Sequence, residues 1–263
     1  MRVADVGGVR IAYRLEGRGP PLVLLHGAVS DSRSWRPQIE GLAGAFTVVA
    51  WDAPGSGRSP DPAPPFGTDE WAGALAGLLD ALSLGPAHVV GLSWGATIAL
   101  ALAAARPDRV ASLVLAGGYA GWKGSLPPEE CAARLAMALE TAALPPAELA
   151  DLWLPSLVSD DAAPARVAEL RAVVEDAHPE GLRLMARSLA ETDLRPALGQ
   201  IDVPVLLLWG GRDVRSPLAV AEALRRAMPH AELVVIPGAG HVANVERPEE
   251  FTAAVRRFCS AVR

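Results

Sequence analysis

Short apolar runs alternate with segments of helical pattern along this chain, and no other feature of the sequence constrains the fold as strongly. An apolar run of four to seven residues suits a strand that is covered on both faces, as in a parallel sheet. Such runs occupy residues 21–25, 46–51, 88–92, 110–116, 205–209 and 233–236. Helical patterns lie between most of them, at residues 35–42, 69–82, 96–105 and 218–228, and a last one covers 249–262. Strands that alternate with helices predict right-handed crossovers and a doubly wound, mostly parallel α/β sheet.

Two segments depart from this alternation. Residues 9–15 alternate between apolar and polar after a Gly-Gly turn, which predicts a strand of an opening hairpin. Residues 119–200 show no strand pattern, only segments rich in Ala, Leu, Glu and Arg that prolines interrupt. We therefore predict a core of residues 1–118 and 201–263, and a helical cap of residues 119–200 inserted between two strands as a lid. Ser216 is predicted to be the N-cap of the helix that follows it, with Pro217 at the first helical position.

Charge and composition exclude several classes of partner. The formal net charge of −6 argues against nucleic acid, whose phosphates need a basic face. No apolar stretch approaches the roughly 20 residues that span a bilayer, and the N-terminus lacks an apolar signal core. The two cysteines are too few for a disulfide framework and are not spaced as metal ligands. We expect a cytoplasmic protein without a membrane, nucleic-acid or metal partner.

The sharpest motif is Gly91-Leu92-Ser93-Trp94-Gly95. It follows an apolar strand pattern directly and opens an apolar helical segment, which is the strand–turn–helix setting of a nucleophile elbow. Glycines on both sides avoid collisions in so tight a turn, and the helix N-terminus offers N–H groups to an oxyanion. The alternative is a glycine-rich turn of a Rossmann-like domain with Ser93 as a helix cap. The chain has no Gly-x-Gly-x-x-Gly after its first parallel strand, which argues against that alternative.

A serine nucleophile needs a histidine base and an acid that orients it. Of the five histidines, only His241 combines the end of a strand, a glycine loop and a position after every candidate acid. Asp213 follows the strand at 205–209, whereas the strand at 110–116 is followed by Gly117-Gly118-Tyr119 without an acid. The order Ser93, Asp213, His241 is the order found in α/β-hydrolases. The alternatives are a surface histidine, and an Asp213 that merely shapes a turn near Ser216.

On these motifs, together with His26-Gly27-Ala28 and the stretch 52–59, the sequence resembles the α/β-hydrolase fold superfamily over nearly all of the chain outside the cap. Within it the sequence looks most like the lidded group of 3-oxoadipate enol-lactonases, small esterases, cofactor-free haloperoxidases and carbon–carbon hydrolases. The resemblance implies an oxyanion hole from the backbone N–H groups of Ala28 and Trp94. It also implies that Asp52 and Arg58 form a structural hydrogen-bonded pair.

The function predicted from these residues is cleavage of a small carboxylic ester or lactone through an acyl-enzyme, with no metal or organic cofactor. Carbon–carbon bond hydrolysis and cofactor-free perhydrolysis remain alternatives, as does a ligand-binding protein on a hydrolase fold. An apolar pocket between sheet and lid would suit uncharged acyl groups or a lactone ring. Its expected lining is Val29, Trp35, Trp122, Trp153, Val214 and Val242, with the Trp94 side chain beside the serine.

Overall fold

The computed structural model describes residues 1–262, and Arg263, the last residue of the predicted core, lies outside this description. One sheet forms its centre. The strands are, in chain order, β1 (Arg2–Val6), β2 (Val9–Glu16), β3 (Pro21–Leu25), β4 (Thr47–Asp52), β5 (Ala87–Leu92), β6 (Val110–Ala116), β7 (Val205–Gly210) and β8 (Glu232–Ile236). They lie in the order β1-β2-β4-β3-β5-β6-β7-β8. β2 is antiparallel to both neighbours, and all pairs from β4 to β8 are parallel. The predicted doubly wound, mostly parallel sheet is confirmed.

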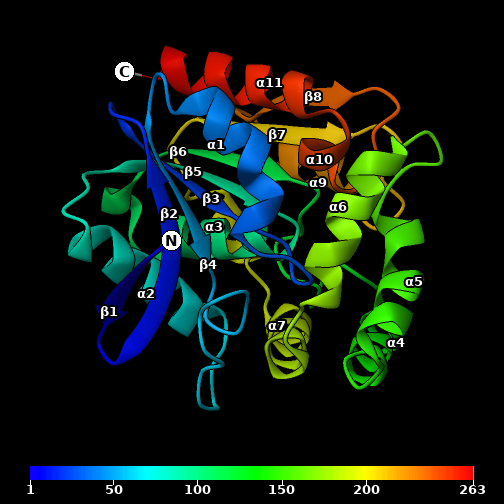
Figure 1. Ribbon diagram of the computed structural model, residues 1–263. Coiled ribbons are helices and arrows are strands. Elements are labelled where there is room, and N and C mark those ends of the chain that lie inside the picture. The colour runs from blue at the N-terminus through cyan, green and yellow to red at the C-terminus, as the bar shows by residue number, and fades with distance from the viewer. Residues whose placement is uncertain (263) are drawn as a thin grey trace.

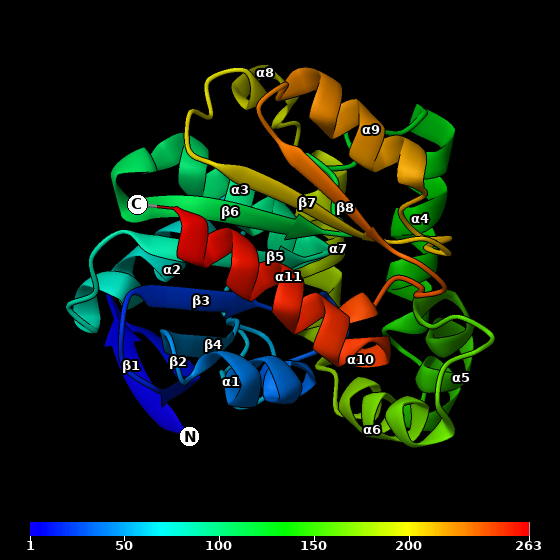
Figure 2. The ribbon, with the colours of Figure 1, turned by 90° about the horizontal axis from the view of Figure 1, so that it is seen from above.

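Helices cover both faces of this sheet, so each face has its own core (Figure 2). On one face lie α2 (Thr68–Ala81), α3 (Trp94–Ala105), α8 (Arg195–Leu198) and α9 (Leu218–Ala227), with the turn η2 (Pro107–Arg109) at the end of α3. On the other lie η1 (Ser32–Trp35), α1 (Arg36–Leu42), α10 (Ala243–Glu246) and α11 (Pro248–Ala261). Burial on both faces explains why the central strands are continuous apolar runs: all residues of β5 and β7 are buried.

The predicted N-cap of the helix after Asp213 was wrong, although its predicted start at residue 218 agrees with the structure. α9 begins at Leu218 with Pro217 as its N-cap, and within residues 1–262 the Ser216 hydroxyl has no hydrogen-bond partner. Ser216 belongs instead to the turn before the helix, where its N–H donates to Asp213 Oδ1 and its carbonyl accepts from Trp209 Nε1.

Between β6 and β7 the chain leaves the sheet and forms α4 (Pro128–Thr141), α5 (Pro146–Leu157), α6 (Pro164–Glu175) and α7 (Pro179–Glu191). Each of these helices begins at a proline, whose fixed φ and missing N–H suit the first helical position. They stack beside the carboxyl ends of the parallel strands, the end to which the arrowheads of β7 and β8 point (Figure 1). We call α4 to α7 the lid.

The strand order places a crevice under this lid. From β3 the chain moves to β4 on one side and then returns to β5 on the other, so the connections diverge between β3 and β5. In open α/β sheets, ligands bind at such a point, outside the carboxyl ends of the strands. Ala28 follows β3 and Ser93 follows β5, so both lie at this crevice.

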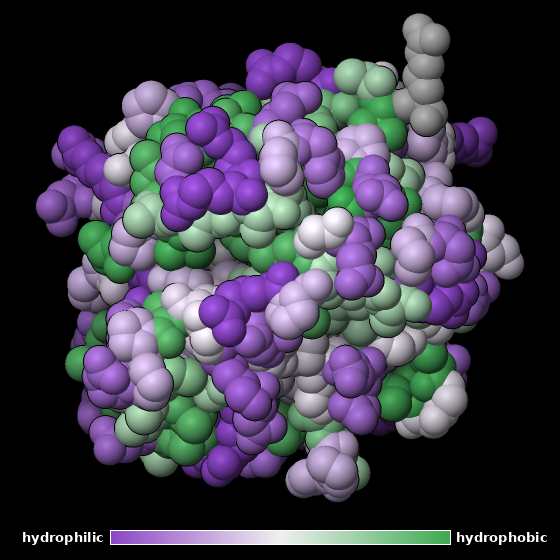
Figure 3. Space-filling model, turned by 180° about the vertical axis from the view of Figure 1, so that it is seen from behind, coloured by the Kyte–Doolittle hydropathy of each residue, from purple (hydrophilic) through white to green (hydrophobic). Residues whose placement is uncertain are grey.

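The surface mixes polar and apolar residues. In the view from behind, hydrophilic and hydrophobic groups are interspersed (Figure 3), and the exposed large apolar side chains are scattered along the chain at Met1, Val3, Met137, Leu152, Val214, Leu218 and Val235. Within residues 1–262 no helix has the length and apolar character needed to cross a membrane.

Candidate active site

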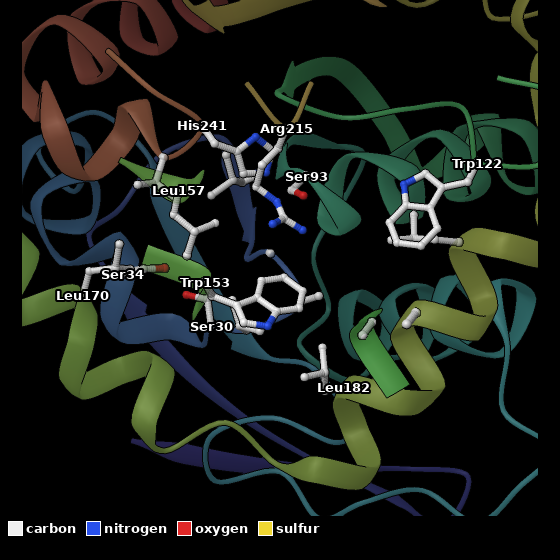
Figure 4. A pocket seen from close by; sticks show the side chains of 18 residues that line it. Ser30, Ser34, Ser93, Trp122, Trp153, Leu157, Leu170, Leu182, Arg215 and His241 are labelled. Carbon is white, nitrogen blue, oxygen red and sulfur yellow. The ribbon is translucent and has the colours of Figure 1, made fainter. Parts of the chain in front are cut away.

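Ser93 occupies the sharp turn that joins β5 to α3. Its backbone has φ 54° and ψ −115°, and residues other than glycine rarely adopt such a positive φ. A Cβ on Gly91 would collide with the carbonyl oxygen of Gly95, and one on Gly95 would collide with the carbonyl oxygen of Leu25. The turn therefore requires both glycines, and it directs the Ser93 side chain away from the sheet into the crevice (Figure 4).

Asp213 lies in the loop after β7, and backbone donors fix its carboxylate. Oδ1 accepts hydrogen bonds from the N–H groups of Arg215 (2.9 Å) and Ser216 (2.8 Å). Oδ2 is 2.8 Å from Nδ1 of His241. Both side chains of this pair are buried: that of Asp213 is 0% exposed and that of His241 is 4% exposed. Asp213 thus shapes the turn and also meets the histidine, so the two readings of its role are compatible.

His241 comes from the glycine loop between β8 and α10. Because its Nδ1 donates to the Asp213 carboxylate, Nε2 is the ring nitrogen left to act as an acceptor. His241 and Ser93 line the same pocket (Figure 4). Among residues 1–262 the Ser93 hydroxyl has no side-chain hydrogen-bond partner. In hydrolases the hydrogen bond between the serine and the histidine often forms or shortens only when substrate is bound.

The loop after β6 makes room for the pair. Gly117 has φ +55°, and a Cβ there would lie 3.1 Å from Asp213 Oδ2 and from the His241 ring. β6 is therefore followed by a glycine and not by an acid, and this glycine leaves the space in which Asp213 and His241 meet.

Two backbone N–H groups flank the serine. Trp94 is the first residue of α3, and the first N–H groups of a helix have no partner within it. Ala28 follows β3, lines the pocket with Ser93, and makes no hydrogen bond through its N–H within residues 1–262. His26 holds the segment before Ala28: its Nδ1 donates to Gly27 O (2.8 Å), and its Nε2 accepts from Ala53 N–H (3.0 Å). Burial lowers the pKa of His26, consistent with this neutral form.

Asp52 serves the loops under the site through backbone groups. Its carboxylate accepts from the N–H groups of Ser32 and Arg58, each at 2.9 Å. The bond to Arg58 therefore uses the backbone and not the guanidinium group. Among residues 1–262 there is no group of three or more His, Cys, Asp or Glu side chains arranged to hold a metal ion.

The pocket between sheet and lid is narrow and mostly apolar. Its cavity volume is about 40 Å³. The core contributes apolar residues at Ala28, Val29, Leu92 and Val242, and the cap segment contributes Trp122, Ala138, Trp153, Leu157, Leu170, Leu182, Ala186 and Leu189. The polar lining residues are Ser30, Ser34, Ser93, Arg215 and His241.

Three expected pocket residues lie elsewhere. The ring of Trp35 is fully buried in the core against Phe251, at 5.8 Å between ring centroids. Val214 is 67% exposed, whereas the side chains of its neighbours point inward: Asp213 is buried and Arg215 lines the pocket. The Trp94 side chain packs edge-on against Trp71 and donates to Ser188 Oγ (3.1 Å), and it does not line the pocket. Val29, Trp122, Trp153 and Val242 do line it. Arg215 does too, and it was not predicted.

The histidine loop is attached to the lid. Glu246 is buried, and its Oε1 accepts from Gly240 N–H (2.8 Å) while its Oε2 accepts from Ser159 N–H (3.0 Å) and Ser159 Oγ (2.6 Å). The N–H of Val242 donates to the carbonyl of Leu157, the last residue of α5 (3.1 Å). Two ion pairs, Arg33–Asp176 and Arg212–Asp161, and a hydrogen bond between His178 and Asp61 also join the cap segment to the core.

The sheet order, the serine turn and the helical lid together define the α/β-hydrolase fold. The family model described as "Alpha/beta hydrolase family" matches residues 22–254, and the chain belongs to this family. It is 31% identical to the putative carbamate hydrolase RutD of Azorhizobium caulinodans, with 100% of this chain and 99% of that protein covered. It is 32% identical to the pimeloyl-[acyl-carrier protein] methyl ester esterase of Nitrosomonas europaea, with 90% and 94% covered.

Solved structures agree with this assignment. A thermophilic esterase from Thermogutta terrifontis, solved with malate bound, superposes with a TM-score of 0.92 at 30% identity, covering 100% of this chain and 99% of that one. The enol-lactonase from Burkholderia xenovorans has a TM-score of 0.90 at 30% identity, covering 98% and 100%.

Proposed function

We propose that this hydrolase cleaves small carboxylic esters or lactones, with Ser93 as nucleophile, His241 as general base and Asp213 as the acid that orients it. One observation carries the proposal. The buried 2.8 Å hydrogen bond between Asp213 and His241 Nδ1 leaves His241 Nε2 for Ser93, and both residues line one pocket. The strained backbone at Ser93 supports it, since such strain collects at functional sites.

The reaction follows from these positions. Ser93 Oγ attacks the carbonyl carbon of the substrate and passes its proton to His241 Nε2, while Asp213 stabilises the imidazolium. The N–H groups of Ala28 and Trp94 hold the oxyanion, each donor contributing about 2.7–4 kcal/mol in comparable sites. The intermediate collapses, the C–O bond breaks, and the alcohol leaves with the proton from His241. Water then attacks the acyl-enzyme with His241 again as base, which releases the acid and restores Ser93.

The pocket supports a small substrate. Its narrow apolar space has room for a short acyl chain or a single ring beside Ser93. An enol-lactonase and a methyl ester esterase occur among the similar proteins, which supports ester and lactone chemistry. A carbamate hydrolase also occurs among them, and carbamates would use the same attack on a carbonyl carbon.

The test is a panel of p-nitrophenyl esters from two to twelve acyl carbons, with γ- and δ-lactones, on the wild type and Ser93→Ala. We expect turnover of the short members and loss of more than about a thousandfold in kcat in Ser93→Ala, since removal of a triad member leaves only the oxyanion hole and binding. Circular dichroism should show that the variant keeps its fold. Equal turnover by both proteins would refute the nucleophile assignment.

A further inference from the structure

Arg215 is a charged side chain in an otherwise largely apolar pocket. It lies two residues after Asp213, and its backbone is held on both sides: its N–H donates to Asp213 Oδ1, and its carbonyl accepts from Tyr119 OH (3.1 Å) and Arg134 Nη1 (2.9 Å). This turn sends the side chain inward. Figure 4 shows its guanidinium group reaching between Ser93 and the ring of Trp153.

The contacts of this guanidinium group are neutral. Its Cζ lies 4.4 Å from the centroid of the Trp153 ring, and its Nη1 donates to Ser156 Oγ at 2.9 Å. No carboxylate within residues 1–262 forms an ion pair with it, whereas Arg33, Arg134 and Arg212 each have at least one. The nearby charge of Asp213 raises the pKa of Arg215, but the Asp213 oxygens accept their hydrogen bonds from two backbone N–H groups and His241 and not from the guanidinium group.

A buried charge without an ion-pair partner is unfavourable. Burial, followed by repulsion from the Arg134 guanidinium, lowers the pKa of Arg215 to about 10 despite the attraction of Asp213, so the group is still cationic at neutral pH. A cation withdrawn from water without a partner destabilises a fold, and it is retained where a ligand supplies the opposite charge. Only one of its N–H groups is engaged by another side chain, so donors remain for a ligand.

We propose that Arg215 binds a carboxylate of the substrate, so that the natural substrate is a short ester or lactone that also carries a carboxylate group. This inference rests on the proposed function, and it differs from the expectation of an uncharged acyl group. A planar guanidinium matches a carboxylate in a two-point hydrogen bond. Among residues 1–262 that line the pocket, Arg215 is the one guanidinium group and has no ion-pair partner, whereas the nearby Arg134 is paired with Glu130; one such charge suits a monoanionic carboxylate better than a phosphate dianion. The small pocket limits the substrate to a few carbons between the carboxylate and the reacting carbonyl.

The lid helps to build this subsite. Trp153 and Ser156 both come from α5, whereas Arg215 comes from the core loop that carries Asp213. The carboxylate would therefore be held where lid and core meet, with the reacting carbonyl at Ser93. Substituting the Arg215 side chain leaves the backbone N–H that holds Asp213 in place, so binding can be tested separately from the His241–Asp213 pair.

The experiment compares monomethyl succinate with its neutral isostere, methyl succinamate, by kcat/KM. The wild type should prefer the carboxylate ester, and Arg215→Met should reduce the ratio of the two kcat/KM values on the order of 10- to 100-fold, mostly through KM. Arg215→Lys should restore part of the ratio. Arg226→Met removes an exposed arginine from α9 and should leave the ratio unchanged.

The outcomes separate the two proposals. An unchanged ratio in Arg215→Met, or a wild type that prefers the neutral ester, would overturn the carboxylate subsite while leaving ester hydrolysis in place. If the wild type hydrolyses neither ester, calorimetric titration with glutarate decides: binding that weakens at least about tenfold in Arg215→Met supports the subsite, and absent or equal binding overturns it.

Discussion

At the scale of single residues, the two oxygens of Asp213 have different tasks. Oδ1 holds the turn through the N–H groups of Arg215 and Ser216, and Oδ2 faces His241 Nδ1. An asparagine at this position could keep the first task with its carbonyl oxygen. Its amide NH₂ would then face Nδ1 and force the His241 proton onto Nε2, where Ser93 needs an acceptor.

Asp213→Asn should therefore lower kcat by about four orders of magnitude, the loss that this change causes in other serine hydrolytic triads, with little effect on folding. Initial rates on a short p-nitrophenyl ester and thermal unfolding would measure both effects. Asp52→Asn is the matched control, because within residues 1–262 the Asp52 carboxylate accepts from the backbone N–H groups of Ser32 and Arg58 and contacts no histidine through a hydrogen bond. If Asp52→Asn alone abolished turnover, the assignment of the acid would be wrong.

Residues with local signals could be predicted from the sequence, and residues whose side-chain direction depends on tertiary contacts could not. Glycines flank Ser93, and strand patterns precede Asp213 and His241. The sequence therefore predicted that these three residues lie at one edge of the sheet. Which of Arg212, Val214 and Arg215 points inward depends on the hydrogen bonds of one turn, and no periodicity reports it. A charged residue close behind a candidate acid was the available signal for Arg215.

At the scale of elements, α7 is seated directly on the core. A Cβ at Gly181, in its first turn, would collide with the backbone of Gly55, in the loop after β4. The lid helix and the core loop thus approach as closely as backbones can, and only glycine permits it.

Gly181→Ala should destabilise the protein by about 1–3 kcal/mol despite the better helix propensity of alanine, since the backbone must shift to relieve the collision. Gly73→Ala in α2 is the matched control. A Cβ there meets nothing within 4 Å, so it should be neutral or stabilise by up to about 1 kcal/mol. Urea unfolding measures both, and equal effects of the two substitutions would contradict the close packing of α7.

The strands were predictable to within a few residues because a strand that is buried on both faces needs apolar residues at every position, which gives a continuous apolar run in the sequence. The run at 110–116 forms β6 with those bounds, and the run at 205–209 forms β7 with one residue more. The helix starts of the lid coincide with prolines noted in the sequence. The predicted N-cap at Ser216 was wrong because α9 begins after Pro217, and Ser216 belongs to the turn that Asp213 holds through the Ser216 N–H.

For the whole molecule, buried neutral histidines link stability to pH. Burial lowers the pKa of both His26 and His88 below the ordinary value of 6.5. Below about pH 6.5 the unfolded chain binds protons that the folded chain does not, so the free energy of unfolding falls as pH falls. For His26 the reason is visible, since a proton on Nε2 would displace the Ala53 N–H.

Urea unfolding at pH 7.5, 6.5 and 5.5 should show this loss of stability on the acid side, and His26→Asn and His88→Asn should each reduce the slope. A wild type that is equally or more stable at pH 5.5 than at pH 7.5 would contradict the prediction.

Both sequence neighbours of His241 are tied to the end of α5: Gly240 through Glu246 and Ser159, and Val242 through Leu157. A displacement of α5 would break the Val242 bond and leave Glu246 with one donor instead of three, so the loop that carries His241 would be held less firmly. These hydrogen bonds couple the position of α5 to the order of the loop, and such coupling is reciprocal. A ligand bound against α5 would therefore also help to fix the His241 ring.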